Sequence, residues 1–225
     1  RYTYRKGTDA QSDYEESAEY YYQSRTTYNG QFTGKHTLGN TDKLDWSAGY
    51  SYANRNMPDR RRYTTVLNEE TNQLEVENLN EINREFYRMD EHILSANINY
   101  QHDFSFGIFT PSMKVGAYTE HRAREYNTRF FLYSWKNGLP GAYKVMNVPN
   151  ELLQEKNYGE NGLYLLEQVA WRNNYEGNNL LSAGYVGGNL PLGKLNVYAG
   201  VRFEYNRMEL VSHTQKKEES ATSVV

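Results

Sequence analysis

The amino-acid sequence predicts an all-β fold, namely a wall segment of an antiparallel transmembrane β-barrel with about six long strands, short periplasmic turns and long extracellular loops. Three observations predict this fold. Apolar and polar residues alternate over long segments, short turns alternate with long polar connections, and a polar composition is combined with many aromatic residues. We expect all 225 residues to belong to one partial barrel domain. The expected strands cover residues 19–38, 43–55, 88–104, 111–133, 179–191 and 194–211, and the expected long loops cover residues 56–87 and 134–178.

The alternation is clearest in the last expected strand. Its odd positions hold Leu195, Val197, Ala199, Val201, Phe203 and Tyr205, and its even positions hold Asn196, Tyr198, Gly200, Arg202, Glu204 and Asn206. A strand directs successive side chains to opposite faces, whereas a helix would scatter these residues around its circumference. One face of this strand is therefore apolar and the other is polar.

The other expected strands repeat this pattern. Their apolar sets are Tyr20, Tyr22, Tyr28, Phe32 and Leu38, then Leu44, Trp46, Ala48, Tyr50 and Tyr52, then Leu94, Ala96, Ile98 and Tyr100, and then Met113, Val115 and Ala117. In the strand over 179–191, Leu181, Ala183 and Tyr185 are assigned to the apolar face, although many glycines make the alternation less regular there. Tyrosines at the loop ends of the strands resemble the aromatic girdle that borders a lipid-facing band.

The lengths of the connections favour a membrane barrel over a soluble sandwich. The connections over 38–43, 104–109 and 191–194 are short, whereas those over 56–87 and 134–178 are long and polar. Outer-membrane barrels combine short periplasmic turns with long outer loops, and loops above about 12–15 residues are uncommon in compact domains. The alternative is that a second sheet covers the apolar face. The polar residues on the opposite face of every expected strand argue against it.

The composition excludes several classes of protein. Hydrophobic residues make up only 38% of the chain and the mean hydropathy is -0.91, yet 22 residues are tyrosine, so the chain is polar without being disordered in composition. The net charge of -3 argues against a nucleic-acid partner. The absence of cysteine excludes disulfides and cysteine metal sites. No apolar run is long enough for a transmembrane helix, which needs about 18 residues.

The sequence contains no motif that predicts catalysis. It has no nucleophile elbow, no phosphate-binding loop and no glycine-rich dinucleotide fingerprint. The five histidines lack the spacing of metal ligands. We therefore expect neither an enzyme nor a bound cofactor or metal.

Two groups of residues are candidates for contact with a ligand. Arg60, Arg61 and Arg62 follow Pro58 and Asp59, and they could attract an anionic ligand or a lipopolysaccharide phosphate. The alternative is that they pair with neighbouring carboxylates, as most surface charges do. The second group consists of aromatic residues of the long loop, Trp135, Tyr143, Trp171 and Tyr175, which could stack on sugar rings or pack the loop against itself.

A further series of charges lies on the polar faces of two expected strands. It comprises Glu120, Arg122, Arg124, Arg202 and Glu204. Charges on the inner face of a barrel need partners from adjacent strands or from a plug, and cross-strand ion pairs support a sheet. We expect a structural role for most of this series.

Three segments of the chain resemble consecutive strands of TonB-dependent outer-membrane receptors of the large Bacteroidota type. They are KLDWSAGYSYANRNMPDRRR, KVGAYTEHRAREYNTRFFLY and LPLGKLNVYAGVRFEYNRMEL, and the resemblance extends over about residues 18 to 211. It implies a barrel of about 22 antiparallel strands that is plugged by an N-terminal domain. The chain lacks a plug, a TonB box and a terminal aromatic strand, so we expect it to be an internal portion of the barrel.

The resemblance also implies a location and partners. It implies the bacterial outer membrane and uptake of a scarce nutrient. The implied partners are outer-membrane lipid, a plug domain, the remaining barrel strands and the TonB complex acting through the plug. A surface lipoprotein is a further candidate partner. Two alternatives stay open, namely a non-transporting barrel component of a surface complex and a soluble, tyrosine-rich, glycan-binding β module.

Overall fold

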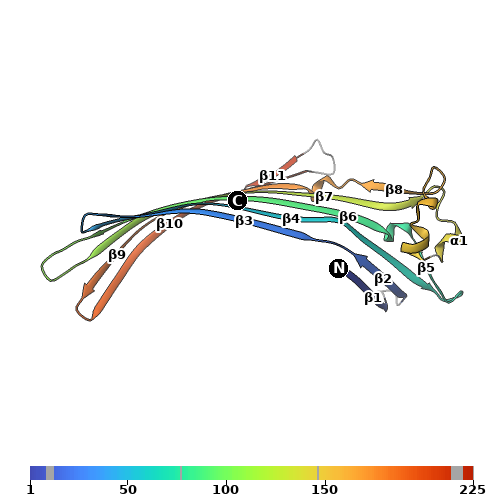
Figure 1. Cartoon of the computed structure of the whole chain (residues 1–225), viewed down its shortest axis with the longest axis horizontal. Coiled ribbons are helices and arrows are strands. Elements are labelled where there is room, and N and C mark those ends of the chain that lie inside the picture. Colours follow the sequence, from blue (N-terminus) through green and yellow to red (C-terminus); the bar gives the residue numbers. More distant parts are fainter. Residues whose placement is uncertain (9–12, 77, 146, 214–219, 225) are drawn as a thin grey trace. The chain divides into compact units, whose positions relative to one another are not determined.

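The computed structural model describes residues 1–8, 13–76, 78–145, 147–213 and 220–224, and these residues form one 11-stranded, nearly all-antiparallel sheet (Figure 1). Neighbouring strands follow the order β1-β2-β4-β6-β7-β9-β10-β11, while β3 and β5 pair with β4 and β8 pairs with β7. This path does not close on itself within the described residues. The predicted all-β fold is therefore confirmed, as an open sheet.

The elements have the following bounds. The strands are β1 (Tyr2–Thr8), β2 (Tyr14–Tyr20), β3 (Ser24–Leu38), β4 (Asp42–Asn68), β5 (Gln73–Glu75), β6 (Asn83–Asp103), β7 (Ser112–Trp135), β8 (Leu163–Gln168), β9 (Tyr175–Leu192), β10 (Leu195–His213) and β11 (Ser220–Val224). The short helices are η1 (Leu79–Glu81), α1 (Gly141–Lys144), η2 (Val148–Leu152), η3 (Glu155–Asn157) and η4 (Trp171–Asn173). Among the described residues, no helix is long and apolar enough to cross a membrane.

The strands extend further into the expected loops than the sequence predicts. The expected loop over 56–87 is wrong at both ends, because β4 continues to Asn68 and β6 begins at Asn83. Residues 61–66 remain in a strand because their backbone pairs with β2. The loop over 134–178 likewise contains β8, which pairs with β7. The expected strand over 19–38 is divided, since β2 ends at Tyr20 and β3 begins at Ser24.

The residues fall into two compact units that we describe separately. Unit 1 comprises residues 1–24, 55–88 and 127–173, and unit 2 comprises residues 25–54, 89–126 and 174–225.

In unit 2, the apolar residues of the sheet are exposed and the polar residues bond to each other. Leu94 is 57% exposed and Ile98 is 50% exposed. Between them in sequence, Asn97 donates a hydrogen bond to Ser47 at 2.6 Å. In a protein that buries its apolar residues against a second layer, this order would be reversed.

The face assigned to β9 is wrong. The even position Val186 pairs with Val201 on one side and with Val115 on the other, so the even positions of β9 share the apolar face. Tyr185 lies on the polar face instead, where its hydroxyl donates to Asn99 at 2.6 Å. Glycines alternate with other residues on both faces of this strand, and its hydrophobic pattern therefore does not define the register.

In unit 1, the long connections fold into a small core. In Figure 1, β5, β8 and α1 lie together at one end of the view. The buried cluster consists of Val76, Leu79, Ile82, Tyr133, Val148, Leu152 and Leu163. It brings residues of the two expected loops into contact and holds both of them against β7.

Candidate functional site on the charged face of unit 1

The pairing of β1, β2 and β4 gathers charged and hydroxyl side chains on one face of unit 1. The register places Arg5 and Thr64 opposite Ser17, and places Thr3 and Arg62 opposite Glu19. Directly opposed residues direct their side chains to the same face of a sheet. This charged face therefore arises from alternate positions of three strands.

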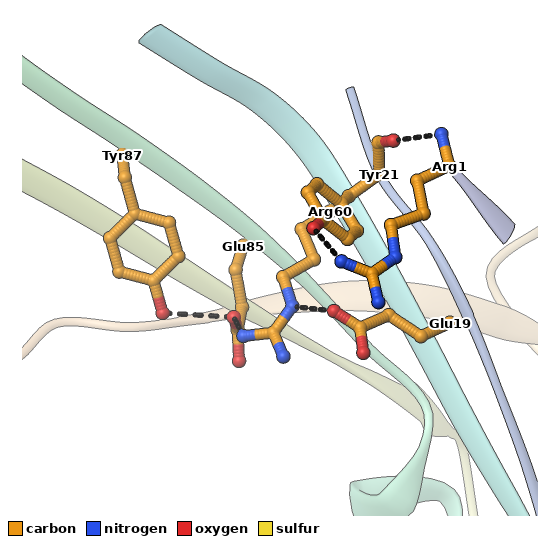
Figure 2. Close-up of polar contacts among 6 residues, drawn as sticks. All are labelled: Arg1, Glu19, Tyr21, Arg60, Glu85 and Tyr87. Carbon is orange, nitrogen blue, oxygen red and sulfur yellow. Dashed lines mark hydrogen bonds and ion pairs between the residues drawn. The ribbon is translucent and has the colours of Figure 1, made fainter. Parts of the chain in front are cut away.

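Arg60 bridges two carboxylates on this face. Its Nε donates to Glu19 at 2.6 Å and its Nη1 donates to Glu85 at 2.7 Å (Figure 2). Glu85 also accepts a hydrogen bond from the Tyr87 hydroxyl at 2.8 Å, and nearby the Arg1 guanidinium donates to the Tyr21 hydroxyl at 3.1 Å. Partial burial lowers the pKa of Arg60, but the bond to Glu19 and the charge of Glu85 outweigh this and raise it above its usual value. Arg60 of β4 thus connects β2 to β6 through two ion pairs.

Arg61 is engaged by a different carboxylate. Asp59 accepts hydrogen bonds from Arg61 Nη2 at 2.6 Å and from Arg84 Nε at 2.6 Å. Burial by itself raises the pKa of Asp59, but the bonds from Arg84 and Arg61 hold this pKa below its usual value. Asp59 has a φ of 60° inside β4, which is a left-handed backbone conformation that is unusual within a strand. The three arginines lie in β4, directly after Asp59, and not in the loop that the sequence predicts.

Arg62 lines a polar cavity of about 330 Å³ together with Arg5, Arg60 and Asn83. Arg62 and Arg5 make no hydrogen bond or ion pair within the part of the chain that the structure describes. Asn83 is only 3% exposed, and its Oδ1 has no hydrogen-bond partner among the described residues. A buried polar atom without a partner is costly. The cavity thus offers the guanidinium groups of Arg5 and Arg62 and the unsatisfied Asn83 Oδ1 to a polar solute, beside the carboxylates of Glu15, Glu19 and Glu81.

The aromatic candidates are divided between the two units. The rings of Trp135 and Tyr143 lie 4.7 Å apart and pack against the core of unit 1. Trp171 is half-buried in η4 of the same unit. In unit 2, the Tyr175 ring stacks on Tyr126 at 5.2 Å. Trp135 and Tyr143 thus help to pack the long connection.

The charged series of β7 forms the expected cross-strand ion pairs. Arg124 Nη2 lies 2.7 Å from Glu91 of β6, and Arg122 Nε lies 3.3 Å from the same carboxylate. Glu91 is buried, so these two arginines compensate a charge that water does not solvate. In β10, Arg202 instead pairs with Glu204 of its own strand at 2.5 Å.

Several residues of the charged face are absent from the sequence prediction. Arg5 and Asn83 are not among the candidate residues, because residues 1–18 are assigned to no strand and residue 83 is assigned to a loop. Glu19 begins an expected strand, but its partner Arg60 is 41 residues away in sequence, so no local pattern identifies it as part of a site. A weak signal does exist in YTYRKGT (2–8), where two tyrosines alternate with Thr3 and Arg5. That stretch is too short to be distinguished from a turn by alternation alone.

Comparisons with known proteins address the fold. The chain matches no protein-family model and no curated protein. Among solved structures it is similar to the siderophore receptor PiuA from Acinetobacter baumannii, with a TM-score of 0.52 and 10% sequence identity over 94% of this chain. The chain spans 28% of the length of that receptor. The chain thus has the fold of a segment of a β-barrel wall.

Proposed function

We propose that the chain is part of the barrel wall of a TonB-dependent outer-membrane receptor that takes up a scarce nutrient. The observation that carries this proposal is the inverted polarity of unit 2, whose apolar face is exposed while its polar face is hydrogen-bonded. The resemblance of the three sequence segments supports it, as does the structural likeness to a siderophore receptor.

The exposed apolar face suits lipid better than water. Exposed apolar surface costs about 25 cal/mol per Å² in water, and this cost disappears in a hydrocarbon environment. The proposed membrane band comprises residues 44–52, 92–100, 113–121, 180–192 and 195–205. Nine residues of strand, as in the segments over 44–52, 92–100 and 113–121, extend about 30 Å, and the apolar band of an outer-membrane barrel is about 25 Å tall.

One border of this band carries amphipathic rings. Tyr28 stacks on Tyr52 with ring centroids 6.2 Å apart, and Tyr52 lies 5.0 Å from His92. The Tyr50 hydroxyl shares a hydrogen bond with His92 at 2.8 Å. Rings that are apolar on their faces and polar at their tips suit the interface between lipid and water.

In this proposal, the polar face lines the barrel interior and contacts the plug, through which the TonB complex acts. The cavity with Arg5, Arg62 and Asn83 is the candidate point of contact with the nutrient. The chain itself catalyses no reaction and holds no cofactor. A surface lipoprotein could cover the long connections of unit 1.

The membrane orientation can be tested by cysteine labelling, because the chain has no native cysteine. Single cysteines would replace Val197, Ala199 and Val201 on one face of β10, and Asn196, Arg202 and Glu204 on the other. In bilayers, a lipid-phase quencher should reach only the first set. Quenching of both sets would exclude a lipid-facing wall. A chain that stays soluble without detergent and shields the first set from labelling would exclude it as well, and would favour the soluble glycan-binding module.

Uptake requires a separate test in cells. A strain lacking the full-length gene would be compared with its parent during growth limited in turn by iron, cobalamin, a glycan or a peptide. We expect a defect for one of these nutrients, and a protonophore should abolish the gene-dependent uptake. Equal growth under every limitation, in a strain whose protein passes the labelling test, would identify a non-transporting barrel component.

A further inference from the structure

A second cavity lies on the opposite face of β1, β2 and β4 in unit 1. It has a volume of about 660 Å³, and we call it the tyrosine groove. Its lining includes Tyr2, Tyr4 and Tyr63 of the sheet, Gln73 of β5, and Asn147 and Pro149 of the long connection. The register places Tyr63 opposite Ala18, whereas Thr64 of the charged face lies opposite Ser17. Because neighbouring residues of a strand direct their side chains to opposite faces, the groove and the charged face lie on opposite sides of the sheet.

Two of the three tyrosines of the groove are exposed, and the Lys6 ammonium lies 5.4 Å from the centroid of the Tyr4 ring. Tyr2 is 55% exposed and Tyr4 is 44% exposed. The rings are held in place by their neighbours, since Tyr2 lies 4.7 Å from the ring of Tyr20, and Tyr20 lies 6.3 Å from Tyr63. A tyrosine loses little conformational entropy when a ligand covers it, because it has only two side-chain torsions.

The groove also offers two amide side chains, and its one carboxylate is paired with a lysine. Gln73 is exposed and makes no side-chain hydrogen bond within the described residues. Asn147 uses its Oδ1 to accept from the Asn150 backbone at 3.2 Å, which leaves its Nδ2 as a donor. The carboxylate of Glu16 is compensated by Lys6 at 2.9 Å. A neutral ligand with many hydroxyl groups fits this lining better than an ion.

We propose that the tyrosine groove binds a neutral oligosaccharide. The apolar C–H faces of its pyranose rings would pack on Tyr2 and Tyr4, and its hydroxyl groups would bond to Gln73 and Asn147. A volume of about 660 Å³ lies within the range of about 300–1,000 Å³ that is typical of sites for small ligands. This site goes beyond the proposed uptake function and does not depend on it, because it lies outside the charged face.

Calorimetry on the detergent-solubilised chain would test this proposal. The probes are four neutral hexasaccharides, namely maltohexaose, cellohexaose, mannohexaose and xylohexaose. We expect saturable binding of at least one of them. Tyr4→Ala and Gln73→Ala should each weaken that binding about tenfold, as the loss of one ring stack or one set of hydrogen bonds predicts. Tyr4→Trp should retain binding, because it keeps an aromatic face.

The matched control is Tyr198→Ala, which removes a tyrosine that is 73% exposed on β10 of unit 2 and should leave binding unchanged. Gln73→Ala keeps the test decisive if Tyr4→Ala does not fold, because Gln73 is exposed and contributes to no buried cluster. The proposal is overturned if no hexasaccharide binds at millimolar concentration, or if Gln73→Ala binds as the parent does. It is equally overturned if a proline-rich decapeptide binds the groove and the sugars do not.

Discussion

Asp59 combines an unusual backbone with two charged partners. Its φ of 60° lies in the left-handed region, where residues other than glycine, asparagine and aspartate are rarely found. Its carboxylate accepts from Arg61 and from Arg84, each at 2.6 Å. Asp59 thus provides both an unusual backbone conformation within β4 and a carboxylate that two arginines share.

Asp59→Ala should therefore destabilise unit 1 through both effects. Alanine at a positive φ is strained, and its methyl group leaves two arginines without their carboxylate. We expect the free energy of unfolding to fall by about 2 kcal/mol. Denaturant titration in detergent would measure it. Asp59→Asn tolerates the same backbone and should lose about half as much, so equal losses in the two variants would contradict the assigned role of the backbone.

The same residue predicts a pH dependence. Its pKa is lowered in the folded chain, so the folded state stabilises the ionised carboxylate more than the unfolded state does. A group of this kind contributes stability above its unfolded pKa of about 3.9, and this contribution is lost as the pH falls through the lowered folded pKa. The stability difference between the parent and Asp59→Asn should be constant at neutral pH and should shrink below about pH 4. A difference that grows on acidification would reverse the sign and refute the assignment.

At the scale of the strands, alternation predicts the middle of an element better than its ends or its register. The apolar sets assigned to β4, β6, β7 and β10 lie on the predicted faces, because in each of these strands apolar residues alternate with polar ones over several successive positions. The polar part of β4 beyond Arg55 is assigned to a loop, since nothing local shows that β2 supplies its hydrogen bonds. The partners of Arg60 are 41 and 25 residues away in sequence, so no local pattern could identify them.

The close pairing of β9 and β10 gives a prediction for one glycine. Gly200 lies opposite Gly187, and a Cβ at position 200 would approach the Val186 carbonyl oxygen to 2.8 Å. Gly200→Val should therefore push the two strands apart at a cost of about 1–3 kcal/mol. Gly184→Ala is the control, because its nearest neighbour would be 3.9 Å away. Trypsin digestion and denaturant titration would compare the two, and equal stability would show that the strands separate without cost.

At the scale of the whole molecule, the decisive property is the polarity of the sheet in unit 2, whose hydrogen-bonded face is polar and whose exposed face is apolar. Phe203 is 76% exposed, and Leu195, Val201 and Tyr205 are exposed on the same face of β10. Meanwhile the polar side holds bonds such as Asn99 to Asp45 at 2.6 Å. Folding in water would expose the apolar residues and folding in a bilayer would cover them, so the environment should decide the stability of the sheet.

A charge introduced on one face or on the other shows whether the apolar face contacts the bilayer. Val201→Arg places a cation on the apolar face near the middle of β10, and it should cost about 2–4 kcal/mol in a bilayer. Asn206→Arg places the same charge on the polar face, and it should change the stability by less than about 1 kcal/mol. Urea titration of both variants in lipid vesicles would measure the difference. If Val201→Arg is tolerated as well as Asn206→Arg, the apolar face does not contact lipid, and another layer of protein must cover it instead.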